Sequence, residues 1–488
     1  MRFLSCILFL SFFHLSYTQI NDSLLIRLGN TTLQKVGANG GYLSILQGND
    51  IVFSEAFGYN DPITKTKLTD SSLFPISSNT KAFNAILLSQ LAEAKKLEFD
   101  KPIKTYLPDL ELKSDFITNE LTLIDLLTHR WGIPRYDFTY YLLSETEKSN
   151  PNKAVFEKLK YLDNSSSFRT QFSYGNNQYI LAAYLLEHLT GDKWEDRLKH
   201  HILEPLQMHN THCNLASYLQ NQNSSLGYQN KKAANISSVQ SLYDVSGMGN
   251  MFSTVNDLEN WASFLLNGNS KILSKDWLDY NLSGHFAIGY EEPYDGFSPI
   301  EYGFGWYIFD YFGHKVVLHH GDNVGHQSLI VLMPDDNIAW IAMMNEGMRT
   351  NSFPFRMTFY LFEMIAGKEM HDWNKLLERD ETIYLRHPLV LDSTKKAPQL
   401  PLKEYAGTYT HQGFGDIFID LKNEQLLLTA GTYFDSLEHS NQNSFTSYSE
   451  DFLEDFMFQF IVEENRVLAL ETDLIEPSLP FIRFEKRD

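Results

Sequence analysis

The sequence predicts an α/β protein with an antiparallel sheet flanked by helices, an inserted helical subdomain and a separate C-terminal antiparallel β-barrel. Three observations predict this fold. Strand-like runs lie near both ends of residues 19–375, segments with helical spacing lie between them, and short strand-like runs return near the end of the chain. Because strands far apart in the chain must share one sheet, the helical segment between them is predicted to be an insertion.

The first predicted elements are a β-hairpin and a helix. The apolar-rich runs 42–46 and 51–57 are separated by Gly48-Asn49-Asp50, the kind of turn that joins hairpin strands. From Ser78 to Ala94 the apolar residues recur with helical spacing, so a helix is predicted to begin at Ser78. The clearest helices of the predicted insertion are 120–128, 177–190 and 255–266.

Strand-like runs return after the helical segment. They are 302–311, 315–319, 328–333 and 338–343, and a closing helix is predicted at 353–365. Residues 376–401 are charged and contain proline, which is typical of a linker. Within 402–488 the short runs 415–421, 425–429, 456–462, 467–472 and 480–484 predict a small antiparallel barrel or sandwich.

The N-terminal residues predict export. Arg2 is followed by the apolar run Phe3 to Leu15 and then by small residues, which is the pattern of a signal peptide spanning residues 1–18. The alternative is a membrane anchor, but the run is shorter than the roughly 20 apolar residues that span a bilayer. The mature protein is therefore expected to be secreted or extracellular, or periplasmic in a bacterium, with no membrane span.

An exported chain raises two questions of covalent chemistry. Once Cys6 is removed with the signal, Cys213 remains alone, so no internal disulfide is expected. Six N-x-S/T sequons predict a glycoprotein if the host is eukaryotic. They begin at Asn21, Asn30, Asn164, Asn223, Asn235 and Asn281.

The charge balance excludes one class of partner. The chain carries 40 Lys and Arg against 61 Asp and Glu, a net charge of −21. Losing Arg2 with the signal makes this 39 − 61 = −22. Such a surface repels phosphate backbones, so nucleic-acid binding is not expected. No zinc-type cluster and no glycine-rich phosphate loop occurs in the sequence, so neither a metal nor an organic cofactor is expected.

The strongest candidate for chemistry is a Ser-x-x-Lys motif at the start of the predicted helix. Ser78 and Lys81 are three residues apart, so on a helix they share one face. At a helix N-terminus the free backbone N–H groups favour negative charge that develops on the serine oxygen. A desolvated Lys81 would be neutral often enough to accept the serine proton. Ser393 and Lys396 show the same spacing by chance in the predicted linker.

Two further motifs follow in the chain. In Tyr174-Gly175-Asn176 a phenol near a lysine can shuttle protons, and the amide of Asn176 can hold both the lysine and a substrate carbonyl. Tyr174 leads directly into a predicted helix, unlike the bare match Tyr228-Gln229-Asn230.

The third motif is His319-His320-Gly321. Its glycine lets a strand pass close to a substrate, and the backbone N–H of Asp322 would complete an oxyanion hole with that of Ser78. A structural role for His319 is the more common alternative. His411-Gln412-Gly413 matches the same pattern in the C-terminal segment.

In this order the three motifs resemble those of class C β-lactamases, penicillin-binding proteins and related esterases, with histidine in place of a lysine. The segment Leu126 to Pro134 and the strand Tyr302-Gly303-Phe304-Gly305-Trp306 resemble further signatures of that family. The resemblance covers residues 25–370 and implies a β-lactamase-like domain, and the tail resembles lipocalin-like modules. It implies Ser78, Lys81 and Tyr174 as catalytic residues, and Asn176, His319, Gly321 and Asp322 around the substrate.

Together the motifs predict a serine hydrolase that forms an acyl-enzyme on Ser78 and hydrolyses a small ester or amide. A histidine with an unperturbed pKa is largely neutral at pH 7, so a penicillin-like carboxylate would lack its usual cationic partner at His319. The alternatives are a β-lactamase or a peptidase acting on D-amino-acid substrates, and a binding protein that kept the fold without turnover. The sequence does not predict the oligomeric state.

Overall fold

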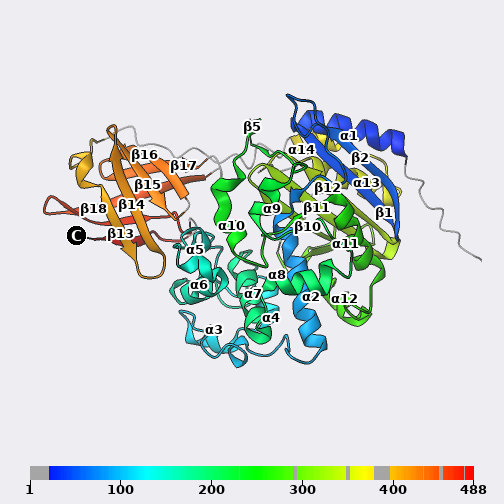
Figure 1. The fold of residues 1–488 in the computed structure, drawn as a ribbon, viewed down its shortest axis with the longest axis horizontal. Coiled ribbons are helices and arrows are strands. Elements are labelled where there is room, and N and C mark those ends of the chain that lie inside the picture. The colour runs from blue at the N-terminus through cyan, green and yellow to red at the C-terminus, as the bar shows by residue number, and fades with distance from the viewer. Residues whose placement is uncertain are drawn as a thin grey trace, which may run out of the picture.

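A computed structural model describes residues 21–229, 231–289, 294–347, 352–378, 396–431, 433–449, 454–476 and 479–487. It contains a large sheet, a helical region packed on one face of that sheet, and a C-terminal barrel at the opposite end of the molecule (Figure 1). This is the predicted α/β architecture, and both the sheet built from distant segments and the closed barrel are confirmed.

The sheet of the described residues has eight strands in the order β2-β1-β12-β11-β10-β9-β8-β7. Their bounds are β1 Gly40–Gln47, β2 Asp50–Gly58, β7 Phe286–Ala287, β8 Glu301–Tyr302, β9 Tyr307–Tyr311, β10 His314–Asn323, β11 His326–Met333 and β12 Ile338–Met344. The N-terminal strand β1 pairs with β12, with Ser44 opposite Ile341. Residues almost 300 positions apart thus lie side by side at the centre of the sheet.

Both faces of the central strands are covered, which explains why they are continuous apolar runs. Along β11, Ile330 and Leu332 face the helical region, whereas Leu329 and Val331 face the opposite layer. That opposite layer contains three helices. They are α1 (Asp22–Val36), α13 (Phe353–Ile365) and α14 (Trp373–Glu378).

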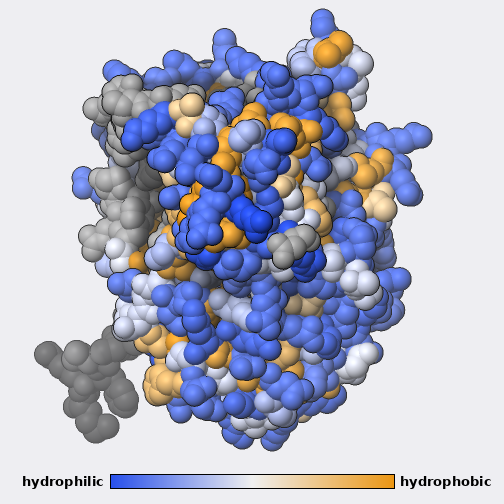
Figure 2. All heavy atoms as spheres, turned by 90° about the vertical axis from the view of Figure 1, so that its left-hand side faces the viewer, coloured by the Kyte–Doolittle hydropathy of each residue, from blue (hydrophilic) through white to orange (hydrophobic). Residues whose placement is uncertain are grey.

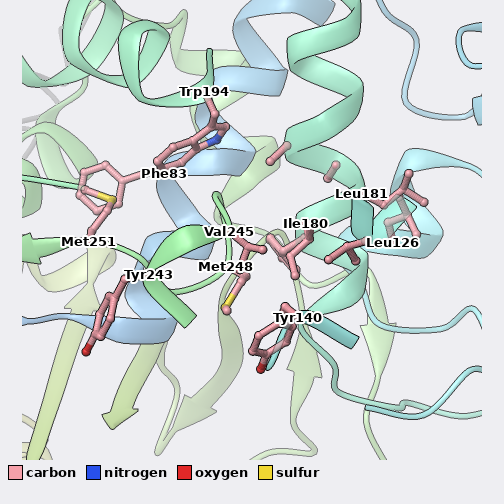
Figure 3. Packing of buried hydrophobic residues seen from close by; sticks show 14 of the residues in the cluster. Phe83, Leu126, Tyr140, Ile180, Leu181, Trp194, Tyr243, Val245, Met248 and Met251 are labelled. Atoms are coloured by element: carbon pink, nitrogen blue, oxygen red, sulfur yellow. The ribbon is translucent and has the colours of Figure 1, made fainter. Parts of the chain in front are cut away.

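The helical region lies between β2 and β7 in the chain. Its helices are α2 (Thr80–Glu93), α3 (Asp115–Glu120), α4 (Leu123–Leu127), α5 (Phe138–Tyr141), α6 (Pro151–Lys158), α7 (Asn177–Thr190), α8 (Trp194–Leu198), α9 (Leu215–Gln220), α10 (Gln240–Asp244), α11 (Val255–Asn267) and α12 (Lys275–Asn281). Figure 3 shows Phe83 of α2, Ile180 of α7 and Trp194 of α8 in one buried cluster. Apolar residues cover nearly all sides of α2 and α7, so both helices are enclosed by the core.

The C-terminal barrel closes from eight antiparallel strands within the described residues. They are β13 (Gly407–His411), β14 (Gly415–Lys422), β15 (Gln425–Ala430), β16 (Tyr433–Asn441), β17 (Ser444–Ser449), β18 (Glu454–Glu463), β19 (Arg466–Thr472) and β20 (Ile482–Lys486). β13 pairs with β20, with Thr410 opposite Glu485, and this pairing closes the barrel. Seen from the barrel end, the surface is mostly hydrophilic with small separate hydrophobic patches (Figure 2).

Several elements were not predicted from the sequence. Helix α1 contains Gly29, a poor helix former, but a Cβ there would lie 2.2 Å from the Phe57 ring, so glycine is required for close packing on β2. Strands β16 and β17 place the polar side chains of Asp435 and Ser447 around the Tyr433 hydroxyl, and this weakens the alternation of apolar residues. Strand β13 was missed as well.

Other expectations lie partly or wholly outside the described residues. The predicted signal peptide 1–18 and Ser393 belong to that part, as do residues 379–395 of the predicted linker. No helix within the described ranges is long and apolar enough to cross a membrane.

The prediction of a glycosylation site at Asn281 is wrong. Asn281 is 1% exposed in α12 and its amide donates to the Ser89 hydroxyl, so the folded protein has no room for a glycan there.

Candidate active site

The candidate nucleophile Ser78 lies in a tight turn between a short strand and helix α2. Strand β3 (Phe74–Pro75) pairs with β6 (Phe252–Ser253), and the 3₁₀ turn Ser77–Asn79 then leads into α2 at Thr80. Ser77 has a φ of 47°, a left-handed conformation that is unfavourable for a residue with a side chain. This strained turn leaves Ser78 partly exposed at the N-terminal end of the helix.

Lys81 is fully buried one helical turn after Ser78 and is surrounded by oxygen atoms. Its Nζ lies 3.1 Å from Ser78 Oγ, 2.8 Å from Asn176 Oδ1 and 2.9 Å from the carbonyl oxygen of Met248. A neutral amine has two N–H donors and one lone pair. Since the two carbonyl oxygens only accept, they take both donors, and the lone pair is left for the proton of the Ser78 hydroxyl.

The environment also favours the neutral form of Lys81. Burial and the positive charge of Arg135 hold its pKa well below the ordinary lysine value, although the Asp137 carboxylate acts in the opposite direction. A buried amine with a lowered pKa beside a serine hydroxyl has the properties of a general base.

Tyr174 lies on the other side of the same serine. Its phenol forms a hydrogen bond with Ser78, and its ring centre is 4.9 Å from Lys81 Nζ. Burial raises the pKa of Tyr174 to about 12, so the phenol keeps its proton at neutral pH. A protonated phenol in this position can donate to an atom bound at Ser78.

Asn176 joins Lys81 to a second set of residues that sequence reasoning missed. While Oδ1 accepts from Lys81, Nδ2 donates to Asp137 Oδ1 at 3.0 Å and to the Tyr140 hydroxyl at 3.1 Å. The predicted contact of Asn176 with Lys81 is present, but its amide donors are already directed to the protein. Asp137 and Tyr140 closely follow the segment Leu126 to Pro134, which is the signal that could have identified them.

His129, from that same segment, supports the Tyr174 turn. Its Nδ1 accepts from the backbone N–H of Gly175 at 3.3 Å, and its ring centre lies 4.5 Å from that of Tyr174. Burial holds the pKa of His129 well below its ordinary value. The neutral ring can therefore accept this hydrogen bond and fix the orientation of the turn.

Strand β10 brings the third motif against the serine turn. A Cβ at Gly321 would lie 2.1 Å from the Ile76 carbonyl oxygen, so only glycine allows this approach. Asp322 directly follows, with its side chain exposed and Oδ2 accepting from Gln327 Nε2 at 3.2 Å. Gly305 permits a second close approach, since a Cβ there would lie 2.7 Å from the backbone nitrogen of Ala82 in α2.

His319 is buried, and both ring nitrogens have protein partners. Nδ1 lies 2.7 Å from the His320 carbonyl oxygen, which can only accept, so Nδ1 carries the hydrogen. Nε2 then accepts from the Tyr302 hydroxyl at 2.9 Å. Burial holds the pKa of His319 well below its ordinary value. The ring thus stays neutral well below pH 6.5, where an unperturbed histidine would begin to charge, and both its nitrogens are already engaged.

The chance matches lie elsewhere. His411 is in the barrel, where its Nδ1 accepts from the Gly413 N–H at 3.0 Å, and Tyr228 lies in the short strand β4 (Tyr228–Gln229). Across the described ranges, no group of three His, Cys, Asp or Glu side chains is arranged to hold a metal ion.

Comparison with known proteins places the chain in a family. A model described as Beta-lactamase matches residues 28–358, and one described as a domain of unknown function (DUF3471) matches residues 391–486. The chain belongs to the β-lactamase family of serine hydrolases. It is similar to unguisins hydrolase ungD' of Aspergillus campestris, with 28% identity over 82% of this chain and 78% of that protein. Protein flp of Staphylococcus aureus is 25% identical over 64% of this chain and 61% of its own length.

Two solved structures share the fold. The octameric penicillin-binding protein homologue from Pyrococcus abyssi superposes with a TM-score of 0.63 at 19% identity, covering 96% of this chain and all of that chain. A D-stereospecific amidohydrolase from Streptomyces sp. has a TM-score of 0.52 at 18% identity, covering 67% of this chain and 95% of the other. The first of these extends over nearly the whole chain, including the barrel.

Proposed function

We propose that this protein hydrolyses small esters or amides through an acyl-enzyme on Ser78. The observation that carries the proposal is the environment of Lys81, whose Nζ lies 2.8 and 2.9 Å from two carbonyl oxygens and 3.1 Å from Ser78 Oγ. In the neutral amine the two carbonyl oxygens take both N–H donors, so the lone pair remains for the Ser78 proton. Lys81 takes the hydroxyl proton while Oγ bonds to the substrate carbonyl carbon. The carbonyl oxygen becomes an oxyanion, which the backbone N–H groups of Ser78 and Asp322 stabilise.

The second half of the cycle returns the proton. As the tetrahedral intermediate collapses, the bond from carbon to the leaving group breaks, and the Tyr174 phenol donates a proton to that group. Lys81 then passes the proton that it took from Ser78 to the neighbouring phenol, whose ring centre lies 4.9 Å from Nζ. Water then attacks the acyl carbon, its proton passes to the same pair, and Ser78 leaves with a restored hydroxyl. Asn176 holds Lys81 in place throughout.

The surroundings of β10 favour neutral substrates over carboxylate-bearing lactams. A lactam carboxylate gains most from a fixed cation, and His319 offers neither a charge nor a free N–H. Esters and amides without an acid group lose nothing from the missing cation, which makes β-lactam hydrolysis the second choice.

The test of this preference is kcat/KM for p-nitrophenyl acetate and for nitrocefin on one preparation at pH 7. We expect the ester value to be higher. Lowering the pH to 5.5 should not improve nitrocefin hydrolysis, because the lowered pKa of His319 keeps the ring neutral. A D-amino-acid p-nitroanilide in the same series measures the amide alternative. Faster turnover of nitrocefin than of the ester would restore the β-lactamase assignment.

Tyr174→Phe should lower kcat by about 10²-fold or more, the range for loss of a general acid–base group. The phenylalanine ring still packs against His129, so KM should change much less. Tyr184→Phe is the matched control, because it removes the same hydroxyl group from a tyrosine on α7 that lies outside the site. This variant should keep wild-type rates. A kcat near wild type in Tyr174→Phe would mean that protons pass through Lys81 alone.

A further inference from the structure

The C-terminal barrel contacts the hydrolase domain beside the active site. The contact is made by residues 135–141, here called the docking segment. The backbone N–H of Tyr136 donates to Glu476 Oε2 at 2.9 Å, and both residues are buried. Glu476 follows β19 in the barrel, 340 residues further along the chain. A hydrogen bond from a backbone N–H to a buried carboxylate is of the stronger, charge-assisted kind.

Aromatic rings extend this contact. Tyr136 stacks on Phe414 with ring centres 6.1 Å apart, and Phe138 meets the edges of Tyr433 and Phe456 at 5.7 and 5.6 Å. Gly431 lies so near the segment that a Cβ there would be 2.0 Å from the Tyr141 carbonyl oxygen. The segment and the barrel interior therefore belong to one continuous buried cluster.

On its other side, the docking segment holds Asn176, the residue that binds Lys81. Asp137 and Tyr140 accept both N–H groups of the Asn176 side chain, whose oxygen binds Lys81. The next residue, Asn177, donates to the carbonyl oxygens of residues 135 and 136, and its own side-chain oxygen accepts from Thr139. Tyr136, which contacts the barrel, thus accepts from Asn177, and Asp137 next to it accepts from Asn176, the residue that holds Lys81.

The segment also needs an external support. Tyr136 has a φ of 45°, a left-handed conformation that a tyrosine adopts only when its surroundings hold it there. Its N–H is the group that Glu476 binds, and its phenol accepts from the backbone N–H of Asp163. Without the carboxylate, the backbone at Tyr136 can relax toward an ordinary conformation, and Asp137 would move with it.

We propose that the barrel is a working part of the hydrolase, and that Glu476 is a positioning residue for Lys81. The carboxylate holds Tyr136 in its strained conformation, the docking segment holds Asn176, and Asn176 holds Lys81 against Ser78. The proposal rests on the proposed function, because Lys81 is taken as the base that activates Ser78. It assigns the domain of unknown function a role in the reaction of its neighbour.

The test compares Glu476→Ala with Glu476→Gln in the full-length protein. Alanine removes the acceptor, and we expect kcat for p-nitrophenyl acetate to fall by about 10-fold or more with a smaller change in KM, since misplacing a catalytic group is costly. Water reaching Lys81 should raise its lowered pKa, so the acid limb of the kcat/KM profile should move to higher pH. Glutamine keeps an acceptor oxygen and should restore both values to within about 3-fold of wild type.

A matched control separates positioning from loss of stability. Phe445 is buried in the barrel against Phe460, away from the docking segment. Phe445→Leu should lower the melting temperature of the barrel. It should leave the pH profile of kcat/KM unchanged when the rates are normalised to the amount of Ser78 that a fluorophosphonate probe labels. If Glu476→Ala leaves kcat and the acid limb at wild-type values, or if Phe445→Leu shifts them equally, the barrel does not position Lys81.

Hydrogen exchange distinguishes this failure from failure of the proposed function. In Glu476→Ala the amides of residues 135–141 and 174–178 should exchange faster, whereas Glu476→Gln should protect them as in wild type. Unchanged exchange would overturn the positioning role even in an active enzyme. Faster exchange in a protein whose turnover does not depend on Ser78 would retain the coupling and overturn the proposed chemistry.

Discussion

Replacing Ser78 with alanine should reduce ester turnover by about 10⁴-fold or more, because no covalent intermediate can form without the hydroxyl. The side chain lies in a partly open turn and its Oγ contacts Lys81 and Tyr174, so the fold should be retained. A fluorophosphonate probe should label Ser78 in the wild type and leave the variant unlabelled. Peptide mass spectrometry of the labelled protein gives the modified residue.

The control for this experiment is another serine on the same helix. Ser89 is fully buried in α2, where its hydroxyl accepts from Asn281, and Ser89→Ala should keep both labelling and activity per folded molecule. Labelling at Ser393, or full activity in Ser78→Ala, would refute the assignment. A protein that is labelled at Ser78 but turns over no substrate would be the silent binding protein that the sequence left open.

Replacing Lys81 with methionine should lower kcat/KM by about 10³-fold or more, within the usual range for losing a general base. Methionine has a similar length but no amine, so the Ser78 proton has no basic acceptor. In the wild type, kcat/KM should rise with pH as Lys81 loses its proton. Because burial and Arg135 lower the pKa of Lys81, this rise should lie well below pH 10.5, and the enzyme should be active near neutrality.

Lys158 provides a matched buried lysine outside the site. It is 5% exposed and pairs with Glu147 at 3.2 Å, and burial lowers its pKa as well. When rates are normalised to the amount of Ser78 that the fluorophosphonate probe labels, Lys158→Met should leave kcat/KM and the acid limb of its pH profile unchanged. If Lys81→Met retains the wild-type pH profile, another group must activate the serine.

Much of the candidate site could be predicted because its signals are local. Ser78 and Lys81 share one helical turn, so spacing alone places their side chains together. Gly321 was predicted to let a strand pass close to a substrate, whereas the close approach that the structure shows is to the Ile76 carbonyl oxygen beside the serine turn. The contact between Asn176 and Lys81 joins residues 95 positions apart, and it was predicted from the chemistry of an amide near a lysine rather than from local spacing.

Other parts of the site carry no local signal. The engaged nitrogens of His319 depend on Tyr302, and the lowered pKa of that histidine depends on burial, which only the packed sheet creates. Asp137 and Tyr140 look like ordinary loop residues in the sequence. Their role follows from two hydrogen bonds to Asn176 across a turn that no periodic pattern describes.

The sequence by itself determined the general arrangement of strands around an inserted helical region, the presence of a barrel and the identity of the candidate nucleophile and base. Periodicity and short spacings report on neighbours within a few residues, and these features depend on such neighbours. Only the tertiary structure decided that Lys81 is buried among three oxygen atoms, that His319 has no donor to offer, and that Glu476 reaches Tyr136. Desolvation and contacts between distant segments arise only when the chain packs, so the spacing of residues along the sequence does not reveal them.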